Sequence, residues 1–202
     1  MEVAYSTLLA RPVANESALG SRITKELSLD GKAHPRLVSL GGDHTIVLPI
    51  LRALHKVYGP ISVIHFDAHL DTWATYPGAS TEQSRVTHGT FFFLAAEEHL
   101  MSNSSIHAGI RCKMNGPSDI ENDKTVGFQV ISTDDIDDYG IPEIIRRIRA
   151  RIGSQPVYLS FDIDVIDPGL APASMSVRFY SFLGTESIQR GHQKLVVGQR
   201  AR

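Results

Sequence analysis

Residues 61–71 read ISVIHFDAHLD, and this stretch decides the fold. Its first part, residues 61–66, is a near-continuous apolar run, which is typical of a strand that is covered on both faces of a parallel sheet. Gly59 and Pro60 precede the run and break the preceding element. Because polar residues follow directly, the stretch predicts a buried strand whose carboxyl end carries a site, which is where open α/β sheets place ligands.

The polar residues after this strand are Asp67, His69 and Asp71, at positions i, i+2 and i+4. In an extended chain successive side chains alternate between faces, so these three project to the same side. Ionisable groups held side by side repel one another or stay poorly solvated unless a cation neutralises them. The spacing therefore favours a metal site.

Two further segments offer matching donors. Residues 160–164 read SFDID and again end an apolar run with two acids, whereas residues 41–45 read GGDHT and place a histidine at the tip of a glycine turn. Oxygen-rich sites with some nitrogen and no thiolate suit Mn²⁺ better than structural zinc. Four carboxylates exceed the need of one ion, so we expect two Mn²⁺ ions roughly 3.5–4 Å apart. The predicted ligands are His44, Asp67, His69, Asp71, Asp162 and Asp164.

Each of these residues also has an ordinary structural interpretation. A single aspartate more often caps a helix or accepts backbone N–H groups in a turn, and a single histidine such as His44 is more often a loop residue than a ligand. The structural interpretation would require the same coincidence at three separate strand ends, so the combination favours the metal site.

The rest of the chain alternates apolar runs with amphipathic stretches, which predicts an α/β fold. We expect a loop at residues 72–87 and one domain over residues 1–173. The helices are expected at residues 15–29, 45–58, 88–100 and 134–150, and the strands at residues 36–40, 61–66, 105–110, 127–131 and 156–163.

Composition excludes several classes of function. The 202 residues carry a formal net charge of −2, which gives no strong field for nucleic acid or an anionic membrane. One cysteine, Cys112, allows no internal disulfide. No signal peptide or membrane span is visible. We therefore expect a small-molecule partner, no nucleic acid and no membrane, and a location in the cytoplasm or a mitochondrion.

Together, the GGDH, DAHxD and SFDID segments resemble the ureohydrolase family of arginases, agmatinases and guanidinobutyrases. The run His88-Gly89-Thr90 is similar to that of the agmatinase branch, and the likeness covers roughly residues 37–173. The resemblance implies a three-layer arginase-like α/β fold with a mainly parallel sheet, incomplete at both ends. It also implies hydrolysis of agmatine to putrescine and urea, and it allows a homo-oligomer.

The resemblance further implies a role for each candidate residue. His44 and Asp71 bind one Mn²⁺, His69 and Asp164 bind the other, and Asp67 and Asp162 bridge the pair. Asp71 is catalytic as well, because it orients the attacking hydroxide. His88 is expected at the mouth of the site, where it delivers a proton to the leaving amine. His65 is interpreted as a packed or supporting histidine, whereas surface or packing roles are expected for His34, His55, His99, His107 and His192.

The likeness ends near residue 173. Family members continue into a turn similar to Gly-Thr-Pro-Glu, whose acid meets the guanidinium group, but residues 174–176 depart from it and no matching acid follows. We expect residues 174–202 to be an atypical basic tail that packs less regularly than the domain. Loss of the guanidinium partner predicts weakened substrate binding.

Three alternatives remain open at this point. The first is guanidinobutyrase or another ureohydrolase, because metal ligands do not set the substrate. The second is a single-zinc deacetylase-like hydrolase, which needs fewer acids. The third is an inactive metal-binding pseudoenzyme, which the altered tail favours. The number of bound metal ions separates the second alternative, and urea release separates the third.

Overall fold

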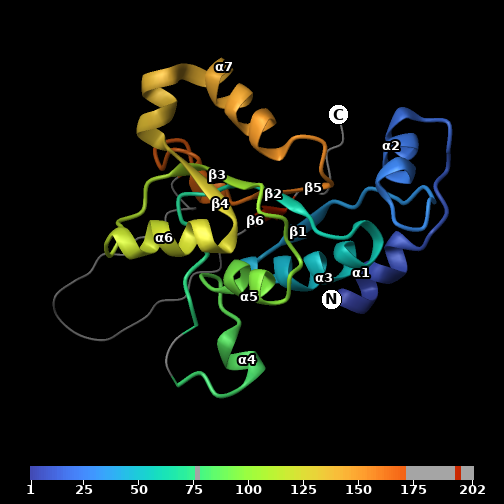
Figure 1. Ribbon diagram of the computed structural model, residues 1–202, viewed down its shortest axis with the longest axis horizontal. Helices are drawn as coiled ribbons and strands as arrows, with labels where there is room; N and C mark the ends of the chain where they lie inside the picture. Colours follow the sequence, from blue (N-terminus) through green and yellow to red (C-terminus); the bar gives the residue numbers. More distant parts are fainter. Residues whose placement is uncertain (76–77, 172–193, 197–202) are drawn as a thin grey trace.

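The computed structural model describes residues 1–75, 78–171 and 194–196 (Figure 1). Its centre is a six-stranded sheet of order β1-β6-β5-β2-β3-β4. Strands β5, β2, β3 and β4 run parallel to one another, whereas β6 is antiparallel to both β1 and β5. The strands are β1 (Ser39–Gly41), β2 (Ser62–Phe66), β3 (Ser105–Ile110), β4 (Phe128–Ser132), β5 (Val157–Phe161) and β6 (Lys194–Val196).

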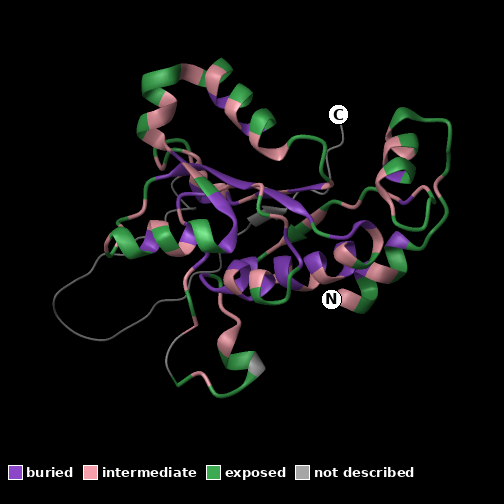
Figure 2. Ribbon diagram, viewed as in Figure 1, coloured by how far each residue is buried: buried purple, intermediate pink, exposed green. Residues whose placement is uncertain are grey.

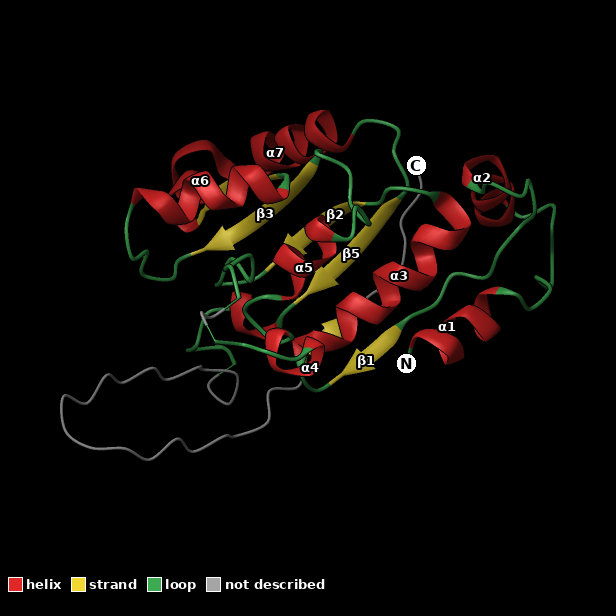
Figure 3. Cartoon of the chain, turned by 60° about the horizontal axis from the view of Figure 1, so that its bottom comes forward, coloured by secondary structure: helices red, strands yellow, loops and turns green. Residues whose placement is uncertain are grey.

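Helices cover both faces of the sheet, as Figures 1 and 3 show, so the fold has three layers. Helix α7 lies on one face, and α1, α3, α5 and α6 lie on the other. The helices are α1 (Glu2–Leu9), α2 (Leu19–Leu27), α3 (Val47–Tyr58), α4 (Glu82–Arg85), α5 (Phe91–Glu97), α6 (Pro117–Val126) and α7 (Thr133–Ile152), with short 3-10 turns η1 (His44–Ile46) and η2 (Ile163–Val165).

The core has two parts, one on each side of the sheet (Figure 2). On the α3 side, Val63 of β2 and Tyr158 of β5 pack with apolar residues of α1, α3 and α5. On the α7 side, Ile106 of β3 packs with Ile144 and Ile148 of the helix. The central strands are therefore buried on both faces, as the apolar run at residues 61–66 predicts.

The α/β prediction is confirmed, with corrections to individual elements. The helix expected at residues 15–29 is limited to α2, and the one expected at residues 88–100 is limited to α5. The strand expected at residues 36–40 begins only at Ser39, and the loop expected at residues 72–87 contains the short helix α4. Helices α1 and α6 were not predicted.

Helix α6 escapes prediction because of what its inner face carries. Its buried residues are Asp119, Asp123 and Val126, so two of the three are acids and no apolar stripe marks the helix in the sequence. Helix α1 buries only Tyr5 and Leu9, which is too little periodicity to identify it.

Most of the tail expected at residues 174–202 lies outside the described residues. Its described part, Lys194–Val196, forms β6 between β1 and β5, and the division of the chain at residue 173 stays a prediction. Among the described residues no helix has both the length and the apolar character that a membrane crossing requires.

Candidate metal centre

All six predicted ligands lie at the edge of the sheet where β2 and β5 end. Figure 3 shows these two strands pointing the same way, so the segments that follow them emerge side by side. Phe66 pairs with Phe161 in the register, which places Asp67 next to Asp162. The turn after β1 brings His44 to the same edge.

His44 is held by hydrogen bonds to both ring nitrogens. Its Nδ1 lies 2.8 Å from Asp71 Oδ2, 3.4 Å from Asp67 Oδ2 and 3.8 Å from Asp162 Oδ2, and its Nε2 lies 2.7 Å from Ser160 Oγ. Asp43 caps the η1 turn by accepting a hydrogen bond from Thr45 N at 2.9 Å. The cap and the Ser160 contact together direct the Nδ1 atom of His44 toward the three carboxylates.

A second imidazole, His69, which is partly exposed, also approaches Asp67 and in addition contacts Asp164. His69 Nδ1 lies 3.1 Å from Asp164 Oδ2 and 3.4 Å from Asp67 Oδ1. His69 N also donates to Asp67 Oδ1 at 2.7 Å, which fixes the rotation of that carboxylate. Asp71 has a φ of 55°, a left-handed conformation that aspartate tolerates better than most residues and that clusters at functional sites.

The two acids after β5 are fixed by backbone donors. Asp164 N donates to Asp162 Oδ1 at 3.0 Å, and Ala68 N donates to Asp164 Oδ1 at 3.1 Å. Arg111, at the end of β3, donates through its guanidinium to the carbonyl oxygens of Asp164, Val165 and Ile166. The segment that carries Asp164 is therefore fastened to both β2 and β3.

These contacts form two groups of donors that share one residue. His44, His65, Asp67 and Asp71 have ligand atoms within 4.8 Å of one another, and so do Asp67, His69 and Asp164. Asp162 adjoins the first group through His44. Asp67 thus belongs to both groups, which is the geometry expected of a carboxylate that bridges two ions.

Electrostatics at the site follow from dense packing of opposite charges. Burial opposes the charged form of His69, but contacts with Asp164 and Asp67 outweigh it and raise the pKa of His69 to about 10. Burial would raise the pKa of Asp67, yet the imidazoles of His65 and His69 hold that pKa well below its usual range. Burial also lowers the pKa of His65 to about 4, against the attraction of Asp67.

His88 is exposed and stands apart from both donor groups. Trp73 N donates to Gly89 O at 3.0 Å, so the segment with His88 lies beside the loop that carries Asp71. This position is compatible with the mouth of the site, and the proton-transfer role of His88 stays a prediction.

Three further residues lie beside the site, and two of them, His107 and Asp123, were not connected with it from the sequence. His65 Nε2 lies 3.0 Å from Asp67 Oδ2, which agrees with a supporting role. His107, for which a surface or packing role was expected, is fully buried and contacts both His65 and Asp123. Its signal was the register of two parallel strands, which the sequence does not show.

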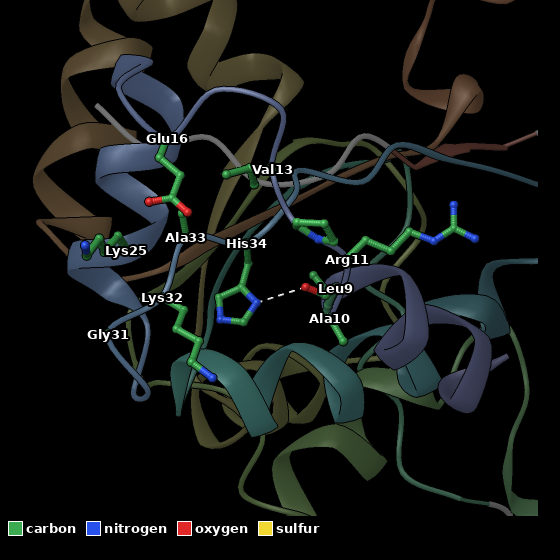
Figure 4. Close-up of a pocket in the computed structure, with 11 residues that line it drawn as sticks. Leu9, Ala10, Arg11, Val13, Glu16, Lys25, Gly31, Lys32, Ala33 and His34 are labelled. Atoms are coloured by element: carbon green, nitrogen blue, oxygen red, sulfur yellow. Dashed lines mark hydrogen bonds between the residues drawn. The ribbon is translucent and has the colours of Figure 1, made fainter.

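A separate cavity of about 310 Å³ opens between α1 and α2 (Figure 4). It is lined by cationic side chains such as Arg11 and Lys32 and by His34. Both ring nitrogens of His34 are engaged, with Leu9 O at 2.9 Å and Asp30 Oδ1 at 2.9 Å. This cavity contains none of the six predicted ligands.

The donor set fits a metal centre on its own chemistry. Asp67 Oδ2 and His65 Nε2 are buried, lie close together and have no aligned hydrogen bond, which is costly without a compensating charge. A mainly parallel sheet with such carboxylates and imidazoles at its carboxyl edge is the arrangement of an α/β protein built to hold metal ions.

Comparison with known proteins places the chain within this class. The sequence profile of the arginase family matches residues 3–178, so the chain belongs to the arginase family. It is 52% identical over 150 residues to "Putative agmatinase 1" of Schizosaccharomyces pombe, covering 73% of this chain and 38% of that protein. It is 41% identical over 143 residues to an agmatinase of Enterobacter sp., covering 70% and 42% respectively.

Among solved structures, the fold is similar to proclavaminate amidino hydrolase from Streptomyces clavuligerus, with a TM-score of 0.60 and 34% identity over 67% of this chain and 44% of that one. The chain thus spans about two-fifths of the length of these relatives. The arginase-like fold implied by the sequence motifs is confirmed by these matches.

Proposed function

We propose that this chain is a binuclear manganese ureohydrolase that hydrolyses agmatine to putrescine and urea. The observation that carries the proposal is the position of the buried Asp67, which is shared by two groups of donors at one edge of the sheet. Relatives named agmatinase, at 40–52% identity, support agmatine as the substrate.

The residues fit two ions as follows. His44 and Asp71 would hold one Mn²⁺, His69 and Asp164 would hold the other, and Asp67 and Asp162 would contact both. When bound, the ion pair supplies Lewis acidity that makes water a nucleophile near neutral pH. The four carboxylates offset the charge of two dications, which is why this oxygen-rich set suits Mn²⁺.

The chain's own groups would carry the rest of the reaction. Asp71, whose Oδ2 lies 2.8 Å from His44 Nδ1 at the same edge of the sheet, would orient the attacking water. His88, exposed beside the Asp71 loop, would give a proton to the departing amine as a general acid. Water then adds to the guanidinium carbon, the C–N bond to the amine breaks, and urea and the protonated amine leave.

A urea-release assay tests this proposal. We expect the Mn²⁺-loaded protein to release urea from agmatine in preference to arginine and guanidinobutyrate. Asp162→Asn should abolish the release, since it removes a carboxylate from both ions, whereas Asp30→Asn, beside the separate cavity, should retain it. Preference for guanidinobutyrate would assign a different ureohydrolase, and absence of urea from all three substrates despite bound manganese would identify an inactive metal-binding protein.

A further inference from the structure

A chain of buried polar side chains extends from the metal centre into the core. His65 of β2 and His107 of β3 are paired in the register of the two parallel strands. Their Nδ1 atoms lie 2.8 Å apart, and His107 Nε2 lies 3.0 Å from Asp123 Oδ1 on α6. At the other end His65 Nε2 lies 3.0 Å from Asp67 Oδ2. The chain therefore connects a predicted bridging ligand with a helix that carries none.

Aromatic rings hold the two imidazoles in place. Phe128 stacks on His107 with ring centroids 3.9 Å apart and planes at 7°, and Phe92 meets the edge of His65 at 4.9 Å. Both imidazoles are completely buried. Because packing fixes each ring plane, the nitrogen atoms are fixed too, so the His65–His107 and His107–Asp123 hydrogen bonds also fix the 3.0 Å approach of His65 Nε2 to Asp67 Oδ2.

At its far end, on α6, this series of polar side chains contacts the segment that carries the predicted ligands. Thr72 Oγ1 donates to Asp123 Oδ1 at 2.8 Å, and Asn122 Nδ2 donates to Thr72 O. Thr72 directly follows Asp71. The route from Asp67 through His65, His107 and Asp123 thus begins and ends on residues 67–72, the segment that carries three of the six predicted ligands.

Burying the Asp123 carboxylate in the core lowers the stability of the fold. Asp123 is only 1% exposed, and its Oδ2 has no hydrogen-bond partner. A buried carboxylate needs compensation from hydrogen bonds or charge, and apolar side chains of similar volume would pack there at lower cost. Unlike apolar packing, this series of polar side chains presents a ring nitrogen to Asp67.

We propose that His107 and Asp123 are positioning residues that, through His65, hold the Asp67 carboxylate in the orientation that metal binding requires. The inference rests on the metal centre of the proposed function. Partners beyond the ligands themselves orient the ligands and typically contribute 10–100-fold to metal affinity.

Substitutions at the far end of the chain test this inference, because they leave every predicted ligand intact. His107→Phe suits the aromatic surroundings but breaks both hydrogen bonds, and Asp123→Asn removes the charge with little change of shape. We expect each to weaken Mn²⁺ binding by about 10–100-fold. The double variant should bind Mn²⁺ no more weakly than whichever single variant binds it less tightly. The affinity losses of residues that act through one hydrogen-bonded series are not additive.

Two further variants separate positioning from general stability. His107→Gln keeps an amide that both donates and accepts, so it should recover part of the affinity that His107→Phe loses. Asp119→Asn changes another buried acid of α6. Asp119 accepts a hydrogen bond from Asn115 N and has no contact with His65 or His107 among those described, so this variant should bind Mn²⁺ like the unmodified protein. Denaturant unfolding of the metal-free variants measures stability independently of metal affinity.

The outcomes are distinct. Unchanged Mn²⁺ affinity in His107→Phe and Asp123→Asn, with stability alone reduced, would overturn the inference, and so would additive losses in the double variant. An unmodified protein that binds no Mn²⁺ would overturn the proposed function as well. Should the variants fail to fold, ¹⁵N-histidine spectra of the unmodified protein decide: added diamagnetic Zn²⁺ should shift the ring nitrogens of His107, and unshifted signals would contradict the positioning role.

Discussion

At the scale of single residues, His69 determines how protons compete with metal. It lies between Asp67 and Asp164, and these contacts raise its pKa to about 10 against the effect of burial. The raised value means that the metal-free protein holds a proton on His69 at neutral pH. A metal ligand must be the neutral imidazole, so metal binding has to displace that proton.

The consequence is a predicted pH dependence. Between pH 6.5 and 8, below the raised pKa of His69, release of one proton on binding makes Mn²⁺ affinity rise by about tenfold per pH unit. The sign follows because a higher pH favours the neutral, ligating form. Calorimetric or chelator-competition titrations at several pH values check the slope. An affinity independent of pH would show that metal binding does not displace a proton from His69.

At the scale of elements, the close approach of β3 to η2 positions Asp164. Gly109, in the irregular part of β3, has a φ of 98°, and an added Cβ would run into the side chain of Val165. Arg111 holds the same turn through backbone carbonyls. Only glycine satisfies both the backbone conformation and this contact. The packing of Gly109 against Val165 therefore helps to set the position of the neighbouring ligand Asp164.

Alanine substitution at matched glycines tests this dependence. Gly153 also has a positive φ, of 56°, but an added Cβ there meets nothing within 4 Å. Gly153→Ala should therefore lose only the roughly 1–3 kcal/mol of a side chain held at a sparsely populated positive φ, whereas Gly109→Ala should lose about 1–3 kcal/mol more from overpacking. Gly109→Ala alone should also weaken Mn²⁺ binding. Equal losses and equal metal affinities in the two variants would refute the role of the contact.

At the scale of the molecule, parallel strand order brings distant segments to one edge. The sequence predicts this much, because apolar runs ending in acids indicate buried strands with a site at their carboxyl ends. The six predicted ligands do converge: His44 from one turn, Asp67 to Asp71 from a second segment, and Asp162 and Asp164 from a third.

The sequence does not predict what depends on register and on helix faces. The pairing of His65 with His107 follows from the alignment of β2 with β3, which no spacing within either strand shows. Helix α6 stayed hidden because its buried face carries Asp119 and Asp123 in place of an apolar stripe. Strand β6 comes from a segment without a clear strand pattern. Long-range partners thus account for the missed features.

The central claim is that the residues at this edge hold two ions through a shared carboxylate. Elemental analysis of protein saturated with Mn²⁺ and freed of excess metal tests it directly. We expect about two Mn²⁺ per chain, with a large loss in Asp67→Asn and no loss in Asp43→Asn, whose amide still caps the η1 turn. A folded protein that retains at most one ion, or an Asp67→Asn variant that retains both, would contradict the account.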